Sequence, residues 1–179
     1  MPTNAKTKAK NSAERKIRST QAGPVGQSPS EALNAIDLLE QDHREVEGFF
    51  EEYGDLVDGT AKGELAKKIC MTLTVHMQIE EEIFYPQARK ATKDNDLLDE
   101  AVVEHAGAKN LIAEIEGMET GDDLYDAKVK VLGEQIKHHV EEEEEELFPE
   151  VADTEMDLDA VGVQMAKRKA ELLKQLAKA

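Results

Sequence analysis

Apolar residues recur at steps of three and four in four stretches of this sequence, and this spacing constrains the fold more than any other feature. Such steps place side chains on one face of an α-helix, whereas a half-buried strand alternates at every second residue. The stretches cover about residues 31–54, 62–85, 96–116 and 122–149, with the third beginning at Asp94 or Asp96. Glycine, aspartate and proline separate them, and we expect Pro86 to end or kink the second helix.

Four helices of similar length joined by short turns pack as antiparallel neighbours. The sequence therefore predicts an all-α fold, an up-down-up-down four-helix bundle over residues 31–152. A fifth stretch at about 158–177 is more weakly amphipathic. It predicts an extra C-terminal helix in an extension over residues 153–179, which packs on the bundle or mediates dimerisation.

Residues 1–30 are polar and contain six Lys or Arg but one acidic residue, so they carry +5 of a total charge of −17 and leave −22 on the rest. This composition predicts a flexible basic tail, with Ser28 or Ser30 as the cap of the first helix. The acidic body repels nucleic acid and anionic membranes, and neither is an expected partner. Because no apolar signal segment or membrane-spanning stretch is present, we expect a cytoplasmic monomer or dimer.

Polar residues interrupt the apolar face, or stripe, of each of the four predicted helices. A histidine occupies a stripe position in every stretch, and in two stretches a glutamate follows four residues later on the same helix face. A buried carboxylate without a partner costs several kcal/mol, and a metal ion removes that cost. The predicted metal ligands are His43, His76, Glu80, His105, His139 and Glu143.

The segments around two of these histidines repeat. HMQIEEEIFYP (76–86) aligns without a gap with HVEEEEEELFP (139–149), which indicates two similar helix pairs. In the acidic run 141–146 only Glu143 is on the stripe, and the others are assigned to a solvated face. His138 is about 100° round the helix from His139, which places it on the surface or beside a ligand. Tyr85 aligns with Phe148, which favours packing over chemistry for Tyr85.

The set of donor atoms narrows the choice of metal ion. Four imidazoles and two carboxylates suit iron, zinc or manganese, and six donors exceed what a tetrahedral zinc site takes. If both glutamates bridge, two ions each receive two histidines and keep open positions for a small ligand. Two irons bridged by carboxylates and an oxygen fit this arrangement. Cys70, in an apolar run, is expected to fill the core.

Over residues 34–150 the chain resembles the hemerythrin-like family, specifically its HHE cation-binding domains. The matching motifs are Asp42-His43, His76-x-x-x-Glu80-Glu81 to Pro86, Glu104-His105, and His139-x-x-x-Glu143-Glu144 to Pro149. The resemblance implies a four-helix bundle with a non-heme di-iron centre, oxo- or hydroxo-bridged, held by the six residues above.

The resemblance also shows a departure. Oxygen-carrying hemerythrins have a second histidine four residues after the one on the third helix, where this chain has Lys109, and an aspartate in place of Glu143. The four-histidine, two-glutamate members of the family imply sensing or nitric oxide and peroxide handling. We expect a di-iron protein that binds or reacts with O2, NO or peroxide. The alternatives are an iron- or oxygen-responsive sensor acting through a protein partner, a metal buffer, and a plain structural bundle.

Overall fold

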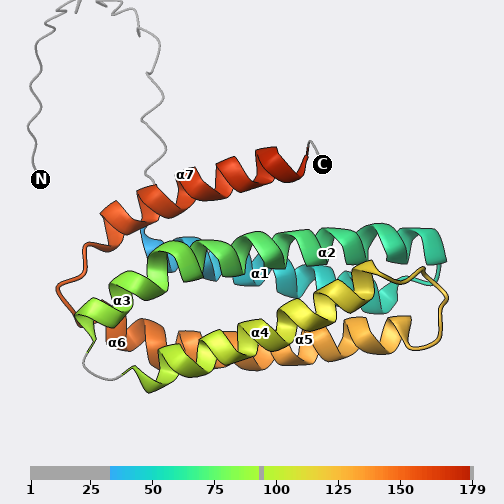
Figure 1. Ribbon diagram of the computed structural model, residues 1–179, viewed down its shortest axis with the longest axis horizontal. Helices are drawn as coiled ribbons and strands as arrows, with labels where there is room; N and C mark the ends of the chain where they lie inside the picture. Colours follow the sequence, from blue (N-terminus) through green and yellow to red (C-terminus); the bar gives the residue numbers. More distant parts are fainter. Residues whose placement is uncertain (1–32, 93–94, 178–179) are drawn as a thin grey trace, which may run out of the picture. The chain divides into compact units, whose positions relative to one another are not determined.

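A computed structural model describes residues 33–92 and 95–177, and the predicted tail and Asp94 lie outside these ranges. The described residues contain helices and no strand (Figure 1). The bundle consists of α1 (Ala35–Asp55), α2 (Gly59–Ile79), α4 (Asp96–Glu116) and α5 (Tyr125–Glu142). Contacts join α1 to α2, α2 to α4, α4 to α5 and α5 to α1, which is the predicted up-down-up-down bundle.

Side-chain caps set the helix starts. The Asn34 side chain accepts a hydrogen bond from the Asp37 amide at 3.0 Å, so α1 begins at Ala35, and the predicted serine caps were wrong. Asp58 caps α2 in the same way, through the Ala61 amide. These caps satisfy amide groups that have no partner within the helix.

Both repeated segments stay helical past their proline, so the second predicted helix does not end at Pro86. A π-helical turn, η1 (Glu80–Phe84), joins α2 to α3 (Tyr85–Ala91), and η2 (Glu143–Leu147) joins α5 to α6 (Phe148–Ala152). Pro86 and Pro149 lie at the start of the α-helical segment after each turn. A proline at the first helical positions removes no required hydrogen bond, so the wider turn lets the chain continue as helix.

The predicted C-terminal helix is α7 (Leu158–Leu176), and it packs on α1, α2 and η1 (Figure 1). Its buried face carries Val161, Met165 and Leu172. None of the described helices is both long and apolar enough to cross a membrane.

The core has two apolar clusters with a polar layer between them. Leu39 belongs to one cluster and Val46 to the other, and His43 lies between them on α1. Cys70 is buried in the second cluster, as predicted. Val102 and Leu124 also lie at helical steps of three and four in the apolar pattern of the sequence, but the structure leaves both exposed.

Candidate metal centre

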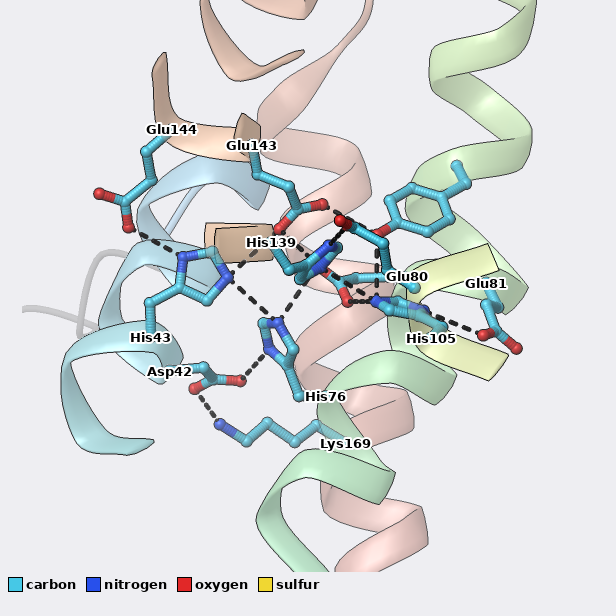
Figure 2. A network of polar contacts seen from close by, with 12 residues as sticks. Asp42, His43, His76, Glu80, Glu81, His105, His139, Glu143, Glu144 and Lys169 are labelled. Atoms are coloured by element: carbon cyan, nitrogen blue, oxygen red, sulfur yellow. Dashed lines mark hydrogen bonds and ion pairs between the residues drawn. The ribbon is translucent and has the colours of Figure 1, made fainter. Parts of the chain in front are cut away.

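The structure brings all six predicted ligands together in the polar layer, and all are buried (Figure 2). The imidazoles meet in two pairs through their Nε2 atoms. His43 Nε2 lies 3.2 Å from His76 Nε2, and His105 Nε2 lies 3.1 Å from His139 Nε2. Each pair joins two neighbouring helices of the bundle.

The two carboxylates each lie between the imidazole pairs. Glu80 Oε1 is 3.2 Å from His76 Nε2, and its Oε2 is 3.4 Å from His105 Nε2. Glu143 Oε2 lies 3.3 Å from His43 Nε2 and 3.5 Å from His139 Nε2. Both glutamates therefore present oxygen to both halves of the site.

The opposite ring nitrogen of each histidine, Nδ1, faces a carboxylate from another helix. These contacts are Asp42 with His76 at 3.5 Å, Glu81 with His105 at 2.9 Å, Glu104 with His139 at 2.8 Å, and Glu144 with His43 at 2.8 Å. In chain order, a carboxylate of α1 contacts the imidazole of α2, and a carboxylate of η1 contacts the imidazole of α4. A carboxylate of α4 contacts the imidazole of α5, and a carboxylate of η2 contacts the imidazole of α1. The pairs therefore form a closed cycle around the bundle.

Cations outside the layer hold three of these carboxylates. Lys169 of α7 binds Asp42, and Arg44 binds Glu144. Lys109 binds both oxygens of Glu81 at 2.6 Å. Lys109, which replaces the second third-helix histidine of the oxygen carriers, thus holds the carboxylate that orients His105. Glu144 contacts His43 and Arg44, so it does not lie on the solvated face assigned to it from the sequence.

The electrostatics of the site call for a cation. An imidazole that donates Nδ1–H to a carboxylate turns the lone pair of Nε2 toward the centre. Both oxygens of Glu80 and Oε2 of Glu143 are buried without a hydrogen-bond partner. Seven electron-pair donors therefore converge on one buried space, and positive charge makes this arrangement favourable.

The pKa values show the same negative field. Burial works to lower the pKa of His76, but the carboxylates of Glu80 and Asp42 raise it to about 10. Burial works to raise the pKa of Glu143, but the imidazoles of His139 and His43 lower it to about 2. This field favours a positive charge at the site, from a proton or a metal ion.

Tyr85, which the sequence assigned to packing, belongs to the site. Its hydroxyl donates to Glu143 Oε1 at 2.9 Å and lies 3.3 Å from His105 Nε2. Burial raises the pKa of Tyr85 well above its ordinary value, and the nearby Glu143 and Glu80 charges raise it further. Phe148 occupies the equivalent place in the other half, where it stacks on His43 with ring centroids 5.8 Å apart. At this position the two halves therefore differ by one hydroxyl group.

The π turn explains why the spacing failed to find Tyr85. In a regular helix, five residues after Glu80 would turn Tyr85 by about 140° away from the carboxylate. In the π turn each hydrogen bond spans one more residue than in an α-helix, as the hydrogen bond from the Tyr85 amide to the Glu80 carbonyl shows. The wider turn brings the side chain back toward the carboxylate. Of the other tyrosines, Tyr53 binds Asp126 and Tyr125 packs in the second apolar cluster.

This geometry defines a class of protein, an all-α bundle with a buried layer of histidines and carboxylates. Residues 34–151 match the model of the hemerythrin HHE cation-binding domain, and the chain belongs to this family.

Two relatives are similar to it. A solved hemerythrin HHE cation-binding domain-containing protein of Mycobacterium kansasii is 24% identical, with a TM-score of 0.66 over 78% of this chain and 87% of that one. It shows the same fold. A protein named DNA nickase from Nostoc sp. strain PCC 7120 is 28% identical over 121 residues, 68% of this chain. The chain spans about a third, 34%, of that relative's length.

Proposed function

We propose that the six side chains hold two iron ions and that the centre binds or reacts with O2, NO or peroxide. The seven converging donor atoms carry this proposal. The ligand atoms form two sets that share one residue: His43, His76, Glu80 and Glu143 in one, and Glu80, His105 and His139 in the other. Nitrogen and oxygen donors suit iron, and a set of six residues is too large for one tetrahedral zinc.

A small apolar cavity beside the layer supports a diatomic ligand. It has room for about one water molecule, and its polar boundary is formed by His43, His76, His139 and Asp42. The rest of the wall is apolar and consists of Val46, Leu73, Met77, Ile136 and Val140. Such a wall excludes water more readily than O2 or NO, so it favours a small, weakly polar ligand next to the Nε2 atoms.

When bound, iron supplies redox chemistry and open coordination positions. The chain's own residues supply order and a proton. The carboxylates at Nδ1 fix each ring with its Nε2 toward the centre. Tyr85 keeps its phenolic proton at neutral pH and donates it to Glu143 Oε1 at 2.9 Å, while its hydroxyl oxygen lies 3.3 Å from His105 Nε2. This side of the centre therefore has a proton source that the Phe148 side lacks.

The test is metal analysis of the full chain expressed with iron, followed by optical spectra of the reduced protein before and after O2, NO and peroxide. Two irons per chain and a new absorption band with at least one of the three ligands are expected. One ion per chain, or zinc in place of iron, would contradict the di-iron centre. Two irons with no optical change for any ligand would contradict the small-ligand chemistry.

One observation favours a sensor role as the second candidate. The closed cycle of histidine–carboxylate pairs joins all four bundle helices to the layer, so the metal acts on the whole bundle. A sensor of this kind loses much of its thermal stability on chelation. Equal melting temperatures of the metal-free and metal-loaded chains would exclude it. DNA nicking is not part of the proposal, because the acidic body repels DNA.

A further inference from the structure

The two halves of the bundle differ in what covers them. In the first half, Val75 and Ile79 are buried, with 2% and 0% of their surface exposed, and they belong to the apolar cluster that includes Met165 of α7. Lys169 of the same helix binds Asp42. One flank of the layer is thus closed by α7.

The aligned positions of the second half carry polar side chains of the types that can bind a metal ion. His138 replaces Val75, Glu142 replaces Ile79, and Glu104 replaces Asp42. The side chains of His138 and Glu142 are 63% and 29% exposed. His138 Nε2 lies 3.2 Å from Glu142 Oε1 and 3.7 Å from Glu104 Oε1. Among the described residues, these three side chains form a further group whose ligand atoms all lie within 4.8 Å of one another.

This outer group is connected to the buried layer. Glu104 uses its other oxygen, Oε2, to hold His139 Nδ1 at 2.8 Å. A small cavity with room for about one water molecule continues from the group to the buried ligands. Its lining residues are Leu97, Ala101, Glu104, His139, Glu142, Glu143 and Leu147. The cavity is therefore lined both by outer-group carboxylates and by predicted metal ligands.

The charge around the group favours cations. The carboxylates of Glu100 and Glu146 act on Glu142 in addition to that of Glu104. A cleft lined by one sign of charge raises the local concentration of the opposite ion, and the rate of its capture, by about 10-fold or more. An imidazole among the carboxylates adds selectivity for transition metals over the hard cations Ca²⁺ and Mg²⁺.

We propose that Glu104, His138 and Glu142 form an outer site that captures a divalent transition-metal ion from solvent and passes it to the buried centre at His139 and Glu143. This inference rests on the proposed metal function. The α7-covered half has Val75 and Ile79 in place of His138 and Glu142, and its Asp42 is bound by Lys169, so ions reach the layer through the open half. Glu104, which contacts both the outer group and His139, is the point of transfer.

The experiment measures the rate of metal uptake separately from the final metal content. Metal-free full-length chain is mixed rapidly with Co²⁺ alone, and the growth of the cobalt absorption bands is followed. We expect uptake by a His138→Ala/Glu142→Gln double variant to slow about 10-fold, with the final content unchanged. Glu141→Gln is the matched control, because it removes a charge from an exposed neighbour on the same helix and leaves the outer group intact.

A charge-neutral variant tests the cavity itself. Ala101 aligns with Leu39 of the closed half, so Ala101→Leu fills the cavity with the residue that the other half uses. We expect slower uptake with the same final content, and circular dichroism checks that the variant is folded. Wild-type uptake rates in the double variant would overturn the proposal, as would a lower final content at an unchanged rate. If the wild-type chain takes up no Co²⁺ at all, the metal function itself fails.

Discussion

Gly162 lies where α7 crosses the start of α1, and replacing it with alanine tests how firmly α7 closes that flank. A Cβ atom at this position would lie 2.3 Å from the Leu33 carbonyl oxygen, 2.7 Å from Asn34 C and 2.8 Å from Ala35 N. All three are backbone atoms that cannot rotate away as the end of a long side chain does. Gly162→Ala therefore forces α7 and α1 apart.

The expected magnitude follows from two opposed effects. Alanine stabilises a helix interior by about 0.5–1 kcal/mol relative to glycine. An added methyl group in a tightly packed contact costs about 1–3 kcal/mol. The net loss is about 1–2 kcal/mol, which corresponds to a melting temperature lower by about 2–8 °C for a chain of this size. Complete detachment of α7 would cost more, because Val161 and Met165 would each lose about 1.5–3 kcal/mol of burial.

Thermal unfolding of the metal-free chain, followed by circular dichroism, measures this effect. Gly48→Ala is the matched control, since a Cβ at Gly48 on α1 would meet nothing within 4 Å. We expect Gly48→Ala to stabilise the chain by about 0.5–1 kcal/mol. A Gly162→Ala variant that melts at or above the wild-type temperature would refute the packing argument.

Three further predictions concern the site and the core. Glu80→Gln removes the negative charge that faces both imidazole pairs. We expect metal analysis to show loss of bound metal, and chelation to leave the melting temperature of the variant unchanged, whereas the exposed Glu141→Gln control behaves as wild type. Full metal content in Glu80→Gln would contradict the ligand set. Tyr85→Phe leaves a buried oxygen of Glu143 without its donor; denaturant unfolding should show a loss of about 1–3 kcal/mol, and a variant as stable as wild type would mean that the hydrogen bond contributes nothing. Burial raises the pKa of Cys70 to about 12, so a thiol reagent at pH 8 should label the native chain slowly and the denatured chain fast; equally fast labelling would show that this part of the core opens readily.

The spacing of the sequence predicted the bundle and the meeting of the six side chains because both depend on regular helix geometry. His76 and Glu80 share a face simply by being four residues apart, and the same holds for His139 and Glu143. Val131 and Leu132 are adjacent apolar residues, and the apolar spacing does not decide which of them faces the core; in the structure Leu132 is fully buried and Val131 is 42% exposed. Local periodicity thus determines a helix face to within about one residue.

Irregular geometry was beyond the reach of that reasoning. A helical wheel has no π turn, so it could not place Tyr85 at the site or carry the helix past Pro86. The partner of a histidine Nδ1 comes from another helix, so Glu144 looked like one more solvated residue of an acidic run. These contacts depend on how the helices are rotated against one another, which a single sequence does not encode in its spacing.

The closed cycle of histidine–carboxylate pairs has a consequence for how the chain selects its topology. Apolar stripes alone pack almost equally well when four helices turn around one another in the opposite sense, because the same faces still meet in the core. In that mirror arrangement, the order of neighbours around the ring is reversed, and the carboxylate of each helix faces away from the imidazole that it holds here. Each mismatched pair would leave buried polar groups unsatisfied at a cost of about 1–3 kcal/mol. We expect the polar layer to specify the handedness of the bundle even before any metal is bound.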